Sequence, residues 1–565
     1  MQRIIALAII SATAFAAPPT DLNGWYPCSP YTFPDEGSVP DLPAECAVYS
    51  APLCYPGICK TPKSVNHLVD IFVKRFPATT GDPETASNVW LLQGGPVESI
   101  MYLLHSQLEG KVNVYTMDHR GTGRSTRLDC VAAQLTTYPL TNELNVTDIP
   151  ACAHDLQKKY GNLASFSTTT AATDLVTFIS KYTNGASTIM YGGSYGTMLV
   201  ERVMHLAPPE VVGYVLDGIA TTSGAPASEF MYASKVDEEF GKVADDFMDL
   251  CEQESSCKPH FEPNGLKSTL QDVIESFDNN PKSPCAALVK NSNNSNDPPS
   301  SILRNALGTV LIDLFTRTLI PPVVYRLNRC SAADIDVLKQ FFTTVSASNQ
   351  ATAADAAFES SLLYDLIVFS EMWETPQVPM TEMKSRFTDA TLSYGVFTMS
   401  PLYCAFSKEK SSSCNEFNVS NYEGNGIIYK RDQYWNKTAT IPNQASVLLL
   451  SGRLDTQTPH KYAESLFKVL DGDKKELVTF DYAPHATIMS TPMDGVTLEP
   501  NSCGINIFAS YVRNGGDLTR LDKSCMDKMP PFNLTTQDIY MYSYLGTNDS
   551  YDGEFDSSLT SESET

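Results

Sequence analysis

A serine between glycines stands at residues 192–196, in the pentapeptide Gly-Gly-Ser-Tyr-Gly. It follows an apolar, strand-like run at 188–191 and precedes a helical run at 197–203. A sharp turn from strand to helix brings backbone segments close together, and glycines avoid the collisions that side chains would cause there. The pattern predicts that Ser194 is a nucleophile at the apex of this turn. An ordinary turn is the alternative, because the motif alone can arise by chance.

A serine hydroxyl needs a histidine that accepts its proton and a carboxylate that orients the histidine. His485 is the expected base, because it lies just beyond the strand-like run 477–480, where a loop can return to the edge of the sheet. Asp455, directly after the apolar run 447–450, is the expected acid. Its rival is Asp217, at the end of an earlier strand-like run. Either acid gives the chain order Ser, Asp, His of the α/β-hydrolase fold.

The oxyanion of an acyl-transfer reaction needs N–H donors that are already in place. One is expected from the backbone amide of Tyr195, the residue after the nucleophile. The other is expected from Gly95, in the tetrapeptide Gln-Gly-Gly-Pro at 93–96, which follows the strand-like run 89–92. A phosphate-binding loop is the rival interpretation of these glycines, but the lysine and the Ser or Thr of a Walker motif are missing.

The elements that must position these residues follow from the hydrophobic pattern. Strand-like runs alternate with helical patterns from residue 65 to about 218, become scarce, and return at 447–450. This alternation is typical of a mostly parallel sheet. We therefore predict an α/β-hydrolase fold with a mostly parallel central sheet and an inserted, largely helical cap domain. The expected parts are a Cys- and Pro-rich extension at 17–60, a core at 61–221 and 441–530, a helical cap at 222–440, and an acidic, disordered tail at 531–565.

The start of the chain and its cysteines indicate the compartment. Residues 1–16 have a positive charge, an apolar run at 4–10 and the small-residue pattern Ala-Phe-Ala at 14–16, the layout of a cleavable signal peptide. Fourteen cysteines fit an oxidising environment, with Cys251/Cys257 and Cys404/Cys414 as plausible local disulfides. We predict a secreted glycoprotein, because six N-x-S/T sequons occur, at Asn145, Asn293, Asn418, Asn436, Asn533 and Asn548.

Charge and spacing exclude several classes of protein. The net charge of −25 disfavours binding to a nucleic-acid backbone, which needs a basic surface. The cysteines show no paired C-x-x-C or Cys/His spacing of a zinc site, and no metal or organic cofactor is expected. No segment beyond the signal peptide has the roughly 20 apolar residues that span a bilayer, so no membrane anchor is expected after cleavage.

Four blocks, in this order, resemble the proline iminopeptidase and tripeptidyl aminopeptidase family of serine peptidases. They are Gln-Gly-Gly-Pro at 93–96, Asp-His-Arg-Gly-Thr-Gly-Arg-Ser at 118–125, Gly-Gly-Ser-Tyr-Gly-Thr at 192–197, and Gly-Arg-Leu-Asp-Thr-Gln-Thr-Pro at 452–459. The resemblance implies the catalytic triad Ser194, Asp455 and His485, the oxyanion donors Tyr195 and Gly95, and a structural loop at 118–125. The chain departs from the family at Gln93, where the family usually has His.

The resemblance also implies an activity. Members of the family release short N-terminal peptides or residues from peptide substrates through an acyl-enzyme. They bind the free amino terminus with acidic cap residues, because a buried ammonium needs a paired charge; Glu371 is the candidate in this chain. A carboxylesterase or lipase could use the same triad, and a non-catalytic, hydrolase-like recognition protein is a further alternative. An epoxide hydrolase or dehalogenase would have Asp where Ser194 stands.

Overall fold

The computed structural model describes residues 21–31, 42–92, 98–130, 144–221, 223–226, 229–292, 296–348, 359–493 and 501–561. The expected signal peptide at 1–16 lies outside these ranges. Within them, no helix combines the length and the apolar character needed to cross a bilayer.

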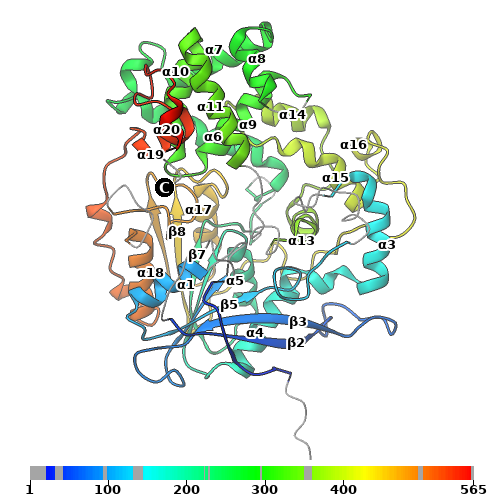
Figure 1. The fold of residues 1–565 in the computed structure, drawn as a ribbon. Coiled ribbons are helices and arrows are strands. Elements are labelled where there is room, and N and C mark those ends of the chain that lie inside the picture. The colour runs from blue at the N-terminus through cyan, green and yellow to red at the C-terminus, as the bar shows by residue number, and fades with distance from the viewer. Residues whose placement is uncertain are drawn as a thin grey trace, which may run out of the picture.

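A nine-stranded sheet forms the centre of the molecule, with the strand order β1-β2-β3-β5-β4-β6-β7-β8-β9 (Figure 1). The first three strands and β5 pair antiparallel, and every pairing from β5 onward is parallel. The strands are β1 (Tyr26–Cys28), β2 (Ala44–Pro52), β3 (Leu68–Phe76), β4 (Asn88–Leu92), β5 (Asn113–Asp118), β6 (Thr188–Gly193), β7 (Val211–Asp217), β8 (Ser446–Gly452) and β9 (Lys475–Phe480).

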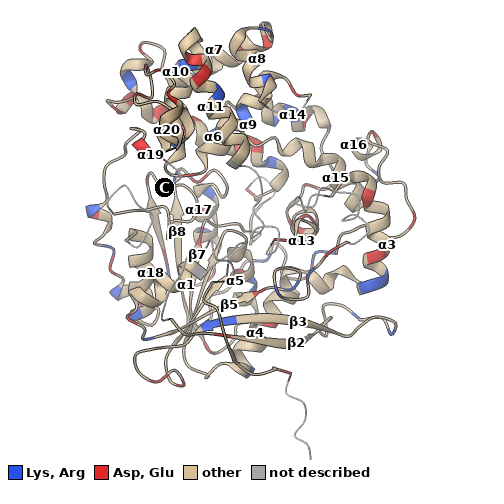
Figure 2. Ribbon diagram, viewed as in Figure 1, with Lys and Arg blue, Asp and Glu red and all other residues tan. Residues whose placement is uncertain are grey.

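Helices cover both faces of this sheet. Val89 and Leu91 of β4 face a cluster that includes α1 (Glu98–Gln107) and α18 (Cys503–Arg513). Trp90, between them in sequence, belongs to the cluster on the other face, which includes α3 (Ile149–Tyr160), α4 (Thr168–Tyr182), α5 (Tyr195–Leu206) and α17 (His460–Val469). Strands buried on both faces need continuous apolar runs, and β4, β6 and β8 carry no charged residue (Figure 2).

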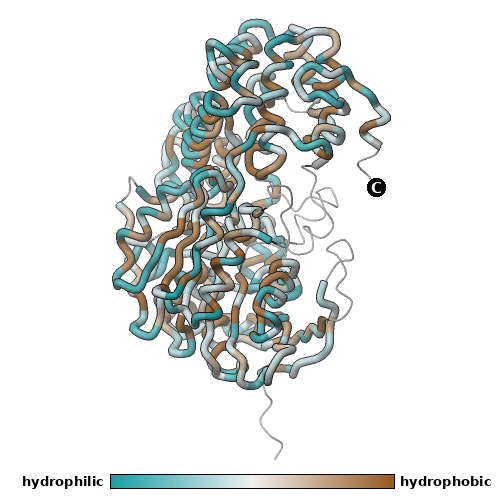
Figure 3. Tube along the Cα trace, turned by 90° about the vertical axis from the view of Figure 1, so that its left-hand side faces the viewer, coloured by the Kyte–Doolittle hydropathy of each residue, from teal (hydrophilic) through white to brown (hydrophobic). Residues whose placement is uncertain are grey.

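A helical insertion separates β7 from β8, and all its described elements are helical or irregular. Its first part has a hydrophobic core of its own (Figure 3). That part contains α6 (Val236–Asp249), α7 (Leu266–Asn279), α8 (Pro284–Asn291), α9 (Pro299–Leu311), α10 (Ile320–Arg329) and α11 (Ala332–Ser348). The second part contains α13 (Ser361–Ile367), α14 (Met380–Thr388), α15 (Ser400–Ser407) and α16 (Ser412–Asn415). Residues of α13 and α15 share the core of the sheet domain. The predicted fold class, an α/β-hydrolase with an inserted helical cap, is confirmed by this topology.

The segment at 17–60, expected as a Cys- and Pro-rich extension, contributes strands to the central sheet. It supplies β1 and β2, and β2 pairs with β3 over eight residues of register. Strand pairing joins positions that are distant in sequence, so the local pattern of Pro and Cys did not predict these two strands.

All fourteen cysteines pair into seven disulfides. Cys251–Cys257 and Cys404–Cys414 are the two local pairs that the sequence suggested. The other pairs are Cys28–Cys46, Cys54–Cys59, Cys130–Cys152, Cys285–Cys330 and Cys503–Cys525.

The prediction of a disordered tail at 531–565 is wrong for residues 531–561, which pack on the cap. Arg326 of α10, fully buried, donates to the carbonyls of Ser550, Asp549 and Gly553 at 2.7, 3.0 and 2.9 Å. The Tyr551 ring stacks on His260, with 3.6 Å between ring centroids. Leu534 and Leu545 join the hydrophobic core of the cap. From Asn548 onward the tail is poor in apolar residues, but a buried guanidinium binds its backbone through hydrogen bonds, which composition does not reveal.

We predict that Arg326→Met frees the tail. The change removes the donor to three carbonyls and weakens the pairing of buried Asp334, so the free energy of unfolding should fall by about 3 kcal/mol. Chemical denaturation measures the loss, and limited proteolysis should cut the freed tail. Lys242→Met, which removes an exposed ion pair with Glu238, is the control and should change stability by less than about 1 kcal/mol. An equal loss of stability in both variants would contradict the role of Arg326 in holding the tail.

Candidate active site

Ser194 occupies a strained turn between β6 and α5. Its φ of 56° and ψ of −124° are unusual for a residue with a side chain, and such strain persists only where the surroundings enforce it. A Cβ on Gly192 would lie 2.3 Å from the Gly196 carbonyl oxygen, so the first glycine of the motif is sterically required. The Ser194 amide donates to the Asp217 carbonyl at 3.0 Å. The structure thus contains the strand–turn–helix that the motif predicted.

Asp455 and His485 form a hydrogen-bonded pair. The fully buried Asp455 carboxylate accepts from His485 Nδ1 at 2.8 Å and from the Thr458 hydroxyl at 2.6 Å through Oδ2. Its Oδ1 accepts from the amides of Gln457 and Thr458 at 2.9 and 2.8 Å. A carboxylate can only accept, so Nδ1 carries the proton and neutral His485 keeps a lone pair on Nε2. This tautomer is the one that a general base requires.

Asp217, the rival acid, has a different task. Its Oδ1 accepts from the amide and the hydroxyl of Thr487, at 2.9 and 2.8 Å. Its Oδ2 accepts from the Ile488 amide and the Tyr191 hydroxyl, both at 3.0 Å. Burial raises the pKa of Asp217, although these hydrogen bonds oppose the rise. The structure therefore places Asp455 against His485 and uses Asp217 to hold the loop that follows His485.

Ser194 and the Asp455–His485 pair meet at the carboxyl edge of the sheet. The strands β6, β7, β8 and β9 are parallel neighbours, and the residues in question follow their carboxyl ends. A Cβ on Gly218 would lie 2.7 Å from Cε1 of the His485 ring, and the neighbouring Asp217 carbonyl holds the Ser194 amide. Ser194 and His485 thus contact the same two-residue segment. Among the hydrogen bonds of the described residues, none joins the Ser194 hydroxyl to His485; such bonds often tighten only when substrate binds.

Burial and two carboxylates determine the pKa of His485. Burial lowers it, but the charge and hydrogen bond of Asp455 and the charge of Asp217 raise it, and the net direction is upward. A basic imidazole that still has a free lone pair on Nε2 is suited to proton transfer near neutral pH.

Of the two expected oxyanion donors, Tyr195 lies within the described residues and Gly95 does not. Tyr195 begins α5, so its amide belongs to the first turn, whose N–H groups have no acceptor within the helix. The positive end of the helix dipole at this turn also favours a developing negative charge. Gly95 lies at 93–97, outside the described residues, and its role stays a prediction.

The block at 118–125 forms a tightly bonded loop. The Asp118 carboxylate accepts from the Arg124 amide at 2.8 Å and from its guanidinium at 2.7 and 2.9 Å. A Cβ on Gly123 would lie 2.4 Å from this carboxylate. Arg120, fully buried, makes a two-pronged ion pair with Asp174, with both contacts at 2.6 Å. These contacts suit a structural role for the loop.

The 118–125 loop also brings His119 to the site, a residue that the sequence did not single out. Its ring centroid lies 5.5 Å from that of Tyr195. Burial lowers the pKa of His119 to about 4, so the ring is neutral at physiological pH. A Cβ on Gly121 would meet Leu363 of α13 at 2.8 Å, so the cap covers this side of the loop.

A buried charge cluster lies on the cap side of α5. Glu371, only 2% exposed, accepts from Arg202 Nη2 at 2.9 Å and from the Tyr429 hydroxyl at 2.7 Å. Arg202 Nη1 also contacts Asp432 at 3.1 Å. Burial raises the pKa of Tyr195, and the Glu371 charge adds to the rise, which places the cluster near the nucleophile turn. The sequence suggested Glu371, but not Arg202 and Asp432, because their pairing depends on the docked cap.

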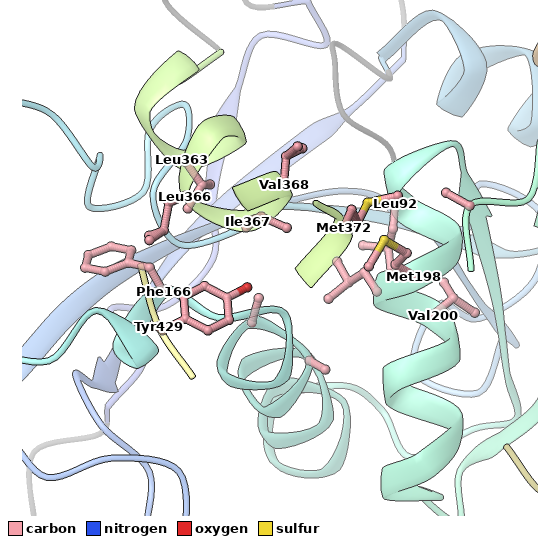
Figure 4. Close-up of a cluster of buried hydrophobic side chains, with 14 of the residues drawn as sticks. Leu92, Phe166, Met198, Val200, Leu363, Leu366, Ile367, Val368, Met372 and Tyr429 are labelled. Atoms are coloured by element: carbon pink, nitrogen blue, oxygen red, sulfur yellow. The ribbon is translucent and has the colours of Figure 1, made fainter. Parts of the chain in front are cut away.

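Apolar contacts fix the cap segment that carries Glu371. Glu371 belongs to η8 (Val368–Met372), a π-helical turn that continues α13. Figure 4 shows Met372 of this turn beside Leu92 of β4 and Met198 of α5. π-helical turns are frequent at functional sites. Within the described residues, no group of three or more His, Cys, Asp or Glu side chains is arranged to hold a metal ion.

The comparisons with known proteins add little beyond the fold. No protein-family model and no curated protein sequence matches the chain. Similar solved structures include an esterase from Exiguobacterium antarcticum (11% identity, TM-score 0.28, 75% of this chain and 91% of that chain covered) and a lipase in open form (10%, 0.30, 80% and 96%). Another is mouse alpha/beta hydrolase domain-containing protein 10 (10%, 0.28, 82% and 97%). With scores this low, the assignment rests on strand order and the serine turn: the chain has the α/β-hydrolase fold.

We predict that Asp455→Asn lowers the pKa of His485 by about 1 to 3 units, because the partner loses its charge. Asp217→Asn should lower it less, since Asp217 does not contact the ring. NMR titration of the His485 ring protons measures both values. Equal shifts in the two variants would contradict the assignment of Asp455 as the partner.

The same pair predicts a pH dependence of stability. A pKa raised in the folded state stabilises the fold below the unfolded value, about 6.5, and this contribution is lost as the pH rises through the folded value. The difference in unfolding free energy between the wild type and Asp455→Asn should therefore shrink with rising pH across this window. Denaturation at a series of pH values tests the slope.

Proposed function

We propose that this chain is a secreted serine peptidase that releases short N-terminal peptides or residues through an acyl-enzyme. One observation carries the proposal: the Asp455–His485 hydrogen bond, with the His485 ring packed on the segment that holds the Ser194 turn. The seven disulfides support an oxidising, extracellular location.

The acylation step uses the triad. Ser194 Oγ attacks the carbonyl carbon of the scissile amide while His485 Nε2 takes the hydroxyl proton. Asp455 stabilises the imidazolium that forms and keeps the ring oriented. The oxyanion accepts from the Tyr195 amide, with Gly95 as the expected second donor. Collapse of the tetrahedral intermediate breaks the C–N bond, and the leaving amine takes the proton from His485.

Deacylation repeats these steps with water. His485 Nε2 takes a proton from a water molecule, whose oxygen attacks the Ser194 ester. The second tetrahedral intermediate expels Ser194 Oγ, which recovers its proton from His485. The products are a carboxylic acid and an amine, and the enzyme returns to its starting state.

The charge cluster favours a substrate with a free amino terminus. The carboxylates of Glu371 and Asp432 share Arg202 as an ion-pair partner, and the Glu371 charge acts on Tyr195 at the nucleophile turn. An ammonium group at the acyl end of a peptide would be stabilised by a carboxylate in this position. This argument favours an aminopeptidase over a carboxylesterase or lipase, whose substrates lack that charge.

Labelling with a fluorophosphonate tests the nucleophile. The reagent should modify Ser194 alone, and Ser194→Ala should abolish labelling and turnover while leaving the melting temperature nearly unchanged. Peptide mapping by mass spectrometry locates the adduct. Ser300→Ala, at a buried serine of α9 that donates to Asp278, is the matched control and should still be labelled. An adduct at another serine, or none, would overturn the mechanism.

Substrate preference is tested separately. Unblocked peptide amides should have a higher kcat/KM than the same peptides with an acetylated amino terminus, by about tenfold or more for one lost ion pair. Glu371→Gln should reduce this ratio, because it removes the carboxylate charge that would pair with the ammonium. Steady-state assays with simple esters complete the set. Hydrolysis of esters without cleavage of any peptide would replace the aminopeptidase by an esterase and leave the triad intact.

A further inference from the structure

The loop that carries His485 is held by hydrogen bonds on both sides of the histidine. After it, the Asp217 carboxylate accepts from the amides of Thr487 and Ile488. Before it, the Tyr482 carbonyl accepts from Arg317 Nη2 at 2.8 Å. Asp217 belongs to the sheet, but Arg317 belongs to the cap, in η7 (Thr316–Leu319). The cap therefore reaches the main chain three residues before His485.

Three elements outside the triad converge on this contact. The Arg317 guanidinium carbon lies 5.7 Å from the ring centroids of both Phe247, in α6, and Phe532, in the C-terminal segment. The Phe532 ring lies 5.0 Å from the Tyr482 ring. The Thr536 hydroxyl donates to the Thr318 carbonyl at 2.9 Å, which ties the C-terminal segment to η7. The Arg317 guanidinium thus lies beside two aromatic rings, one of which also packs near Tyr482.

The charge of Arg317 is poorly compensated. The residue is 4% exposed, and its buried Nη1 has no hydrogen-bond partner among the described residues. Within the described residues, Arg317 forms no salt bridge. The Asp313 charge acts on Arg317 only from a longer distance, and burial lowers the pKa of Arg317 to about 10. Burying an unpaired cation is costly, and an apolar side chain would fill the space between two aromatic rings more favourably. Stability alone therefore does not account for an arginine here.

We propose that Arg317 is a positioning residue for His485, acting through the Tyr482 carbonyl, so that docking of the cap sets the geometry of the triad. The inference rests on the proposed function, in which His485 is the base. A charged donor makes a strong hydrogen bond to a carbonyl in a dry environment, and it fixes the start of the loop while Asp217 fixes its end. Loss of either anchor lets the ring move on Gly218 relative to Ser194.

Arg317→Met is the main test, and Arg304→Met is its matched control. Arg304 is also a buried cap arginine that donates to two carbonyls, of Ala390 and Thr388, both at 3.0 Å, but it does not contact the His485 loop. Arg317→Met should lower kcat and the rate of fluorophosphonate labelling by about tenfold to a hundredfold, with KM little changed, as expected for a displaced catalytic group. The acid limb of the pH profile of labelling should also shift in Arg317→Met relative to the wild type. Arg304→Met should lower the melting temperature without slowing labelling.

Each outcome decides the proposal. If both variants lose stability and label at the wild-type rate well below their melting temperatures, Arg317 is only structural and the proposal is overturned. If Arg317→Met does not fold, Arg317→Lys takes its place: lysine lacks the planar fork that fits between the rings, so slower labelling supports positioning and an unchanged rate overturns it. If the wild type itself is not labelled, the proposed function fails. The His485 ring resonances of Arg317→Met then decide separately whether the loop has moved.

Discussion

The main chain of Asp217 and Gly218 lies between the serine turn and the His485 ring, and the site depends on this arrangement. The Asp217 carbonyl accepts from the Ser194 amide, and the absence of a side chain at Gly218 leaves room for the imidazole. The Asp217 carboxylate then holds the loop after His485. One strand end thus sets the distance between nucleophile and base, and the parallel register of β6, β7 and β8 sets where that strand end lies.

The two parts of the cap contact the sheet domain with different chemistry near the site. Its second part packs apolar side chains of α13 and η8 on α5, with the Glu371–Arg202 ion pair buried beside them. Its first part has a core that also includes Leu454 of the sheet domain, and it reaches the His485 loop through a polar side chain, Arg317. Close packing resists displacement of the apolar side chains, whereas the strength of the Arg317 hydrogen bond changes when the donor–acceptor distance changes by a few tenths of an ångström. The apolar contact lies near the nucleophile Ser194, and the Arg317 contact lies near the base His485.

The sequence predicted the parts of the site that local patterns encode. The glycines around Ser194 and the apolar run before it were sufficient to predict the turn, and the chain order placed Asp455 ahead of His485. The sequence favoured Asp455 over Asp217, and the structure shows that Asp455 is the acid that contacts His485. Both acids lie at or just beyond the ends of parallel strands at the same edge of the sheet, so local pattern alone does not separate them. The Arg202 pairs, the Arg317 contact and the strands β1 and β2 depend on residues far apart in the chain, and no local periodicity reports them. The ordered tail was missed for the same reason: its carbonyls bind Arg326, more than two hundred residues earlier.

That tail has a consequence for biosynthesis. The chain leaves the sheet domain after β7, builds the cap, returns for β8 and β9, and finally sends residues 531–561 back over α10 and α11. Domains fold as units during synthesis when their residues are contiguous. Here the cap receives its contacts with residues 531–561 only after β8 and β9 have been synthesised, so assembly of the cap cannot be completed before the last strands of the sheet are made.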